Sequence, residues 1–277
     1  MNERVIDGIA VREWGDRDAP GLLLWPGLGS AGYYFAAVAA LLPGRAVAVD
    51  PPGFGRSARP DSFDFERLVE QAAALCEACE CVAIVGHSLG GYLAVALAAC
   101  PPAGLRAAVA VDGGFMDRAD LAEIGMPADA GHAALSAWMA ANMPHFPDWD
   151  TAVTQLAAML GAEVTAVIES YAREYLTETA DGIGEAAPPE LLAEVVLAHV
   201  GEAPAAARAA QVAVPTLLIA CGLPAAARAT RELAWQTFAG SSPLIEVHVA
   251  EAWGHNPLLA DPRGAARLIS DWLAPRL

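Results

Sequence analysis

The stretch of sequence that decides the fold is residues 82–91, which read Val82-Ala83-Ile84-Val85-Gly86-His87-Ser88-Leu89-Gly90-Gly91. Its first four residues are apolar and predict a buried strand, and the residues from Tyr92 to Ala99 predict a helix. A serine between a strand and a helix lies on a sharp turn, where flanking glycines remove the Cβ atoms that would clash. The pattern therefore predicts that Ser88 presents its hydroxyl above the sheet.

Strand and helix patterns alternate on both sides of this stretch. After an opening β-hairpin at 5–14, short apolar strands are expected at 22–25, 46–49, 107–111, 216–220 and 245–249, and helices at 33–42, 65–79 and 263–273. Short apolar strands that alternate with helices are typical of a parallel sheet covered on both faces. The expected fold class is therefore α/β, with a mostly parallel sheet flanked by helices.

The strand pattern stops between residues 115 and 211, and this segment is too long for one loop in a compact domain. We therefore expect residues 1–114 and 212–277 to form the α/β core and residues 115–211 to form an inserted helical cap. Large apolar residues of the cap are candidates for a substrate pocket, with the cap's own core as the alternative. These candidates are Trp138, Met139, Met143 and Phe146.

The composition excludes several classes of partner. The 277 residues include 33 acidic and 16 basic side chains, for a net charge of −17, which argues against nucleic acid or an anionic membrane as a partner. The N-terminus shows no secretory signal pattern, and the longest apolar stretch, residues 93–111, is interrupted by prolines and an arginine, which argues against a membrane span. Five cysteines, an odd number, fit a reducing compartment, so we expect a cytoplasmic protein.

Neither a metal nor a cofactor is predicted. Cys76, Cys79 and Cys81 lie close together in the sequence, but no fourth ligand lies near them, so incidental thiols are favoured over a metal site. The sequence contains no Gly-x-x-x-x-Gly-Lys phosphate loop and no Gly-x-Gly-x-x-Gly after a strand. The expected partner is a small-molecule substrate with an apolar acyl portion.

A serine hydroxyl is a poor nucleophile at neutral pH and needs a base that is itself oriented by a carboxylate. His255 follows the last predicted strand, where a loop would overhang the sheet, and is the expected base. His87 is adjacent to Ser88 but would point elsewhere, so we expect it to pack within the fold. The remaining histidines are expected to be structural or to line the substrate pocket: His132, His145, His199 and His248.

In the order and spacing of its motifs, the chain resembles α/β-hydrolase-fold enzymes over nearly its whole length. The motifs are Trp-Pro-Gly-Leu-Gly at 25–29, Asp-Pro-Pro-Gly-Phe-Gly-Arg-Ser at 50–57, Gly-His-Ser-Leu-Gly-Gly at 86–91 and Gly-His-Asn at 254–256. The resemblance implies a Ser–His–acid triad, a lid formed by the insertion, and an oxyanion hole made by the backbone N–H groups of Leu28 and Leu89. The family usually has His-Gly where this chain has Pro-Gly at 26–27, a departure that leaves the Leu28 N–H in place.

The acid of the triad is the residue for which the sequence departs most from the family. Family members commonly carry it in a turn that reads Cys221–Arg228 here and contains no carboxylate. Asp112 is favoured instead, because it ends the neighbouring strand and would reach the same histidine, with turn capping as the alternative. Asp117 is a second candidate, and a dyad without an acid is a third. We expect Asp50 to stabilise its own turn and Asp261 to cap the last helix.

The function expected from these residues is a serine hydrolase that cleaves a carboxylic ester, lactone or thioester through an acyl-enzyme. The missing acid leaves open a non-hydrolytic enzyme on the same scaffold, such as an acyltransferase, a lyase or a cofactor-free biosynthetic enzyme. A catalytically inactive ligand receptor is a third hypothesis, which the presence of both Ser88 and His255 disfavours.

Overall fold

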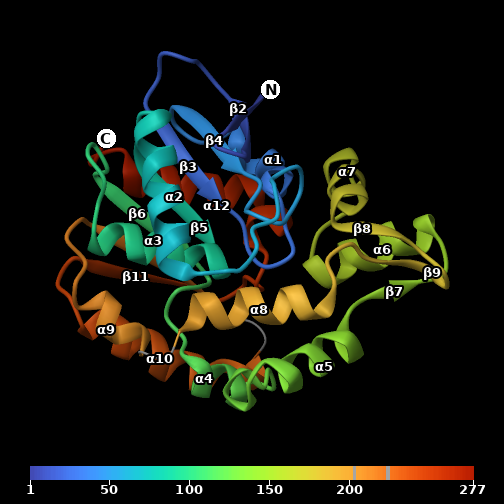
Figure 1. Cartoon of the computed structure of the whole chain (residues 1–277). Helices are drawn as coiled ribbons and strands as arrows, with labels where there is room; N and C mark the ends of the chain where they lie inside the picture. The colour runs from blue at the N-terminus through green and yellow to red at the C-terminus, as the bar shows by residue number, and fades with distance from the viewer. Residues whose placement is uncertain (202–203, 223–224) are drawn as a thin grey trace.

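The computed structural model describes residues 1–201, 204–222 and 225–277. An eight-stranded sheet forms its centre (Figure 1), in the order β1-β2-β4-β3-β5-β6-β10-β11. The strands are β1 (Asn2–Ile6), β2 (Ile9–Trp14), β3 (Gly21–Trp25), β4 (Arg45–Val49), β5 (Cys81–His87), β6 (Ala107–Val111), β10 (Thr216–Cys221) and β11 (Ile245–Ala250). The first two pairings are antiparallel and the other five are parallel, which confirms the expected α/β class.

The central strands are short and apolar because helices cover both faces of the sheet. Every residue of β3, β4 and β6 is buried. In the parallel register His87 pairs with Val111, and Val111 pairs with Ile219. The residues that follow β5, β6 and β10 therefore emerge side by side at one edge of the sheet.

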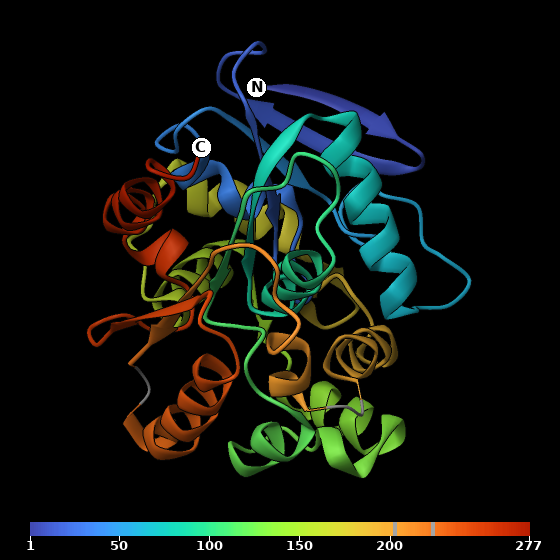
Figure 2. The same ribbon diagram turned by 90° about the vertical axis from the view of Figure 1, so that its left-hand side faces the viewer.

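Helices cover both faces of the sheet. On one face lie α2 (Phe65–Ala78), α3 (Leu89–Ala99) and α10 (Arg228–Gly240), and on the other lie α1 (Ala36–Ala39), α11 (Pro257–Ala260) and α12 (Pro262–Leu273). Figure 2 shows α2 and α12 on opposite sides of the sheet. The helix expected at 33–42 is shorter, because a tight 3₁₀ turn over Gly32–Phe35 precedes α1. The side chain of Asp261 caps α12 by accepting a hydrogen bond from Gly264 N–H, as expected.

The segment between β6 and β10 contains strands as well as helices. Its elements are α4 (Arg118–Glu123), α5 (His132–Asn142), β7 (His145–Phe146), α6 (Trp149–Leu160), α7 (Ala166–Tyr175), β8 (Leu176–Thr179), β9 (Gly182–Glu185), α8 (Pro189–Val200) and α9 (Ala205–Ala209). The three strands form a separate sheet in the order β7-β9-β8, which the purely helical expectation missed. They are two to four residues long, and β9 contains two glycines, so no alternating pattern marked them.

In Figure 1 most of these elements lie below and to the right of the central sheet. We use the word cap for α4 to α8 together with β7, β8 and β9. Within the described ranges, no helix combines the length and the apolar character that crossing a bilayer requires.

Candidate active site

Ser88 lies on the sharp turn that the sequence predicted. Its backbone has φ +52° and ψ −117°, a region that non-glycine residues rarely adopt. The turn closes because Gly86 has no side chain: a Cβ atom there would overlap the carbonyl oxygen of Gly90. Ser88 N–H donates to Val111 O over 2.9 Å, which ties the turn to the neighbouring strand. The turn therefore projects the hydroxyl from the edge of the sheet where the parallel strands end.

Three predicted residues meet at this edge. His255 Nε2 lies 3.0 Å from Ser88 Oγ, and His255 Nδ1 lies 2.7 Å from Asp112 Oδ2. Because an ionised carboxylate only accepts hydrogen bonds, Nδ1 carries the proton and Nε2 presents its lone pair to the serine hydroxyl. The hydroxyl of Ser88 can therefore transfer its proton directly to His255.

Asp112 is held in an ionised form by its partners. Its Oδ1 accepts a hydrogen bond from Cys221 N–H over 2.9 Å and another from the buried guanidinium of Arg231. Burial opposes ionisation of the carboxyl, but the hydrogen bond and charge of His255, with the charge of Arg231, outweigh it and lower the pKa of Asp112. The residue also sits on a tight turn, at φ +47°.

The elements on either side of the turn after β10 contact Asp112. Leu223 and Pro224 of that turn lie outside the described residues. The end of β10 supplies the Cys221 N–H, and α10 supplies Arg231, both of which donate to Asp112. Sequence reasoning missed Arg231, because it is 119 residues from its partner and no motif surrounds it.

The other aspartates that the sequence raised are engaged elsewhere. Asp117 begins α4, where its side chain accepts from the N–H groups of Ala119 and Asp120 in a capping box. Asp50 is fully buried and accepts from Gly32 N–H over 2.8 Å in its own turn region, as expected. Neither carboxylate contacts His255 among the described residues.

His87 packs within the fold, as expected, and contacts the loop that carries His255. Its Nε2–H donates to the carbonyl oxygen of His255 over 2.6 Å, and its ring stacks on Tyr34 with centroids 4.7 Å apart. Burial, with a smaller contribution from His255, lowers the pKa of His87 to about 3, so the ring is neutral. His87 is therefore a positioning residue for His255.

A cavity of about 570 Å³ lies in front of Ser88 and is walled by both core and cap. Trp138, Met139 and Met143 line it, as the sequence proposed. Phe146 does not line it, contrary to expectation: it is 2% exposed and packs in the hydrophobic cluster that includes the inner residues of α6 and α7. Pairing of β7 with β9, which the sequence did not reveal, puts Phe146 opposite Ile183 in that cluster.

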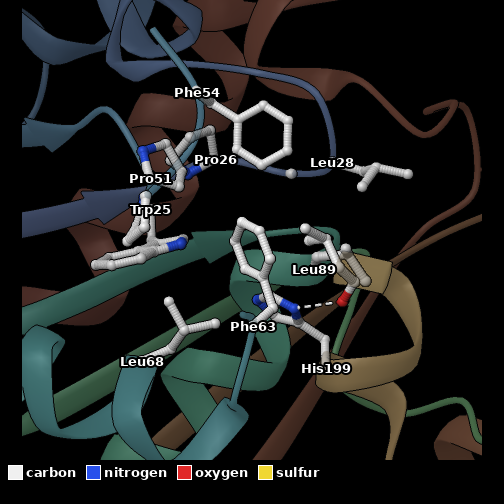
Figure 3. A pocket seen from close by; sticks show the side chains of 12 residues that line it. Trp25, Pro26, Leu28, Pro51, Phe54, Phe63, Leu68, Leu89 and His199 are labelled. Carbon is white, nitrogen blue, oxygen red and sulfur yellow. Dashed lines mark hydrogen bonds between the residues drawn. The ribbon is translucent and has the colours of Figure 1, made fainter. Parts of the chain in front are cut away.

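A second cavity, of about 20 Å³, lies behind the loop that follows β3 (Figure 3). Figure 3 shows Phe54, Phe63 and His199 around it. His199 Nδ1–H donates a hydrogen bond to Val195 O over 2.8 Å. Burial lowers the pKa of His199 to about 4, so this histidine is neutral and structural. The other three histidines outside the site, His132, His145 and His248, contact neither Ser88 nor His255 in the described structure.

The loop after β3 lies against Ser88. A Cβ atom on Gly27 would be 2.8 Å from Ser88 Cβ and 3.4 Å from Ser88 Oγ, so only bare backbone fits there. Leu28 and Leu89 both line the large cavity. The N–H of Leu89 opens α3, where the first amides of a helix have no intrahelical partner. This arrangement suits an oxyanion hole built from two backbone N–H groups.

Cys76, Cys79 and Cys81 are buried free thiols. Within the part of the chain that the structure describes, no group of three or more histidine, cysteine, aspartate or glutamate side chains gathers in a way that could hold a metal ion.

The fold and the site together define an α/β hydrolase. The model of the alpha/beta hydrolase family matches residues 22–268, and the chain belongs to this family. Similar solved structures include an E-2-(acetamidomethylene)succinate hydrolase, with a TM-score of 0.76 and 22% identity over 99% of both chains. The thioesterase domain from the curacin biosynthetic pathway has a TM-score of 0.72 and 20% identity over 97% of this chain and 98% of its own.

Two further relatives are more distant or partial. An esterase of M. tuberculosis has a TM-score of 0.68 and 19% identity over 99% of this chain and 91% of its own. The magnesium-chelatase 30 kDa subunit of Rhodobacter capsulatus is 35% identical over 101 residues, which are 33% of this chain and 34% of that protein. The match therefore spans about a third of that curated relative.

Proposed function

We propose that the protein is a serine hydrolase that cleaves a carboxylic ester, lactone or thioester through an acyl-enzyme. The observation that carries the proposal is the continuous chain of contacts from Ser88 Oγ to His255, at 3.0 Å, and from His255 to Asp112, at 2.7 Å. Membership of the α/β hydrolase family supports it, as do structural relatives named as a hydrolase, a thioesterase and an esterase.

The chemistry follows from the roles that these groups can take. Ser88 Oγ attacks the substrate carbonyl while His255 Nε2 takes the hydroxyl proton, and Asp112 stabilises the imidazolium that forms. The negative charge on the carbonyl oxygen is held by the N–H groups of Leu28 and Leu89. Collapse of the tetrahedral intermediate releases the alcohol or thiol, which takes its proton from His255. Water then attacks the acyl-enzyme with His255 as base, releases the carboxylic acid and restores Ser88.

The cavity favours a substrate with an apolar portion. Its size, about 570 Å³, suits a small molecule, and Trp138, Met139 and Met143 give one side an apolar lining. The contact between Asp112 and His255 also supports hydrolysis over the non-hydrolytic alternative, which was motivated by the missing acid after β10.

The test is turnover on a panel of esters, lactones and thioesters with acyl chains of increasing length. We expect hydrolysis of at least one class, and Ser88→Ala should reduce kcat/KM by about 10⁴-fold or more, because no other hydroxyl replaces the nucleophile. Ser241→Ala, at the exposed end of α10, is the matched control and should keep wild-type turnover. Full turnover by Ser88→Ala on every active substrate would refute the proposal.

A further inference from the structure

One wall of the active-site cavity is polar although most of its lining is apolar. This wall consists of Ser30, Tyr171, Tyr175 and Glu185. Ser30 Oγ and Tyr171 OH lie 2.9 Å apart, so these two hydroxyls satisfy each other. Tyr175 and Glu185 form the second pair, in which the phenol lies beside the carboxyl and favours its charged form. The mechanism proposed above uses none of these four side chains.

Glu185 lies against the loop that carries one expected oxyanion donor. A Cβ atom on Gly29 would be 2.5 Å from Glu185 Oε1 and 3.1 Å from Tyr175 Cε2, so both side chains rest on the bare backbone of that loop. Gly29 is two residues from Gly27, which touches Ser88, and two residues of chain span at most about 7 Å. The carboxyl is therefore within reach of a small molecule that is bound at the nucleophile.

In the part of the chain that the structure describes, no cation balances the carboxyl of Glu185. Glu185 forms no salt bridge within the described residues. The titratable groups around it are Tyr171 and Tyr175 of α7. On the paired strand β8, the residue opposite Glu185 is the apolar Leu176. Burial, partly offset by the hydrogen bond from Tyr175, raises the pKa of Glu185 to about 7. A half-buried carboxylate without a cationic partner is costly, and a donor supplied by a ligand would reduce that cost.

We propose that Glu185, steadied by Tyr175, forms a subsite that binds a hydrogen-bond donor on the substrate, an ammonium or a hydroxyl group carried near the scissile carbonyl. This inference rests on the proposed function, because it names the substrate class of the same cavity. The other charged side chains lining the described cavity are the triad residues and Arg231, which is paired with Asp112. A net charge of −17 also attracts a cationic substrate more than an anionic one.

A purely structural role for Glu185, fastening the cap to the loop, makes a different prediction. Loss of that role would change turnover of all substrates by a similar factor. Loss of a binding subsite changes turnover only for substrates that carry the donor. Selectivity among matched substrates therefore separates the two roles.

The experiment compares three esters that share one alkyl chain and end in an ammonium, a hydroxyl or a methyl group. In Glu185→Gln we expect kcat/KM to fall about 10- to 100-fold for the ammonium ester, by less than about 10-fold for the hydroxyl ester, and to stay within about 2-fold for the methyl ester. The matched control is Glu178→Gln, an exposed glutamate on the same hairpin whose contact is with Trp149. It should leave all three values unchanged.

The pH dependence distinguishes the two donors. Below the pKa of Glu185, about 7, the carboxyl is neutral, so the preference for the ammonium ester over the methyl ester should shrink as the pH falls to 5.5. A preference for the hydroxyl ester should persist, because a protonated carboxyl still accepts a hydrogen bond. If Glu185→Gln does not fold, Tyr175→Phe at pH 7 should weaken the ammonium preference several-fold, because loss of its hydrogen bond raises the carboxyl pKa further.

Equal effects of Glu185→Gln on the three esters, or no effect on any, would overturn the subsite while leaving the hydrolase proposal intact. If the wild-type enzyme cleaves none of the esters, the hydrolase proposal is in question instead. In that case calorimetric binding of the three corresponding methyl ketones tests the subsite alone. Equal Kd values for the three ketones would then overturn it.

Discussion

Two carboxyl groups line the same cavity, one buried and one half-buried, and the fold moves their pKa values in opposite directions. Asp112, at the end of β6, has a lowered pKa because His255, Arg231 and the Cys221 N–H stabilise its charge. Glu185, on the cap hairpin, has a pKa of about 7 because burial disfavours its charge and the interaction with Tyr175 offsets only part of that effect. Burial opposes ionisation of both, so the partners and not the burial decide the outcome.

The opposite pKa shifts of Asp112 and Glu185 distinguish two parts of one site. At the edge of the sheet, both carboxylate oxygens of Asp112 accept hydrogen bonds from groups of the protein itself, as preorganised electrostatic stabilisation requires. At the cap, the carboxyl of Glu185 is left for a group that the substrate brings. We interpret the core as the part that performs the chemistry and the cap as the part that selects the substrate.

The largest effect that would sharpen this comparison is expected at Asp112. Asp112→Asn keeps the shape of the side chain but removes the charge that orients His255, so kcat should fall about 10³- to 10⁴-fold. The measurement is steady-state turnover of the best substrate from the panel. Asp117→Asn, which alters only the cap of α4, should retain activity within about 2-fold. Similar losses in both variants would show that Asp112 has no special role.

A smaller effect, on stability, is expected at Glu185. Its pKa rises from 4.5 in the unfolded chain to about 7 in the fold, so the folded state retains a proton that the unfolded state loses between these pH values. Stability should therefore decline as the pH rises from 4.5 to 7 and stay reduced above it, by at most about 3 kcal/mol.

The measurement is urea unfolding of the wild-type protein and Glu185→Gln at pH 5, 6, 7 and 8. The substitution removes the titrating group, so the variant should lack this decline and gain stability relative to the wild type as the pH rises. Glu178→Gln should follow the wild-type profile. Parallel stability profiles for wild type and Glu185→Gln would show that folding does not raise the pKa of Glu185, and so would contradict the contrast with Asp112.

Much of the core and the centre of the site could be predicted from the sequence. The strand that ends at His87 and the glycines beside Ser88 are local signals, since a buried apolar run and a clash-free turn depend on neighbouring residues. The position of Asp112 followed from one further step, that adjacent parallel strands end at the same edge. The distances show that Ser88, His255 and Asp112 do lie together.

The cap and the supporting contacts could not be predicted in this way. Arg231 reaches Asp112 from a helix far along the chain, and Glu185 meets Gly29 only because β9 folds over the core. We expected Phe146 in the pocket because of its residue type alone. The pairing of β7 with β9 instead directs its side chain into a separate hydrophobic cluster. In each case a long-range contact decides the role, and no local pattern encodes it.

The most direct test of the central claim, an activated serine at position 88, is the rate and site of labelling by a fluorophosphonate. Intact-mass and peptide analysis should find one adduct, on Ser88, and labelling should slow about 10³-fold in Asp112→Asn while Asp117→Asn labels like the wild type. An adduct on another residue, or equal labelling rates in wild type and Asp112→Asn, would contradict the account.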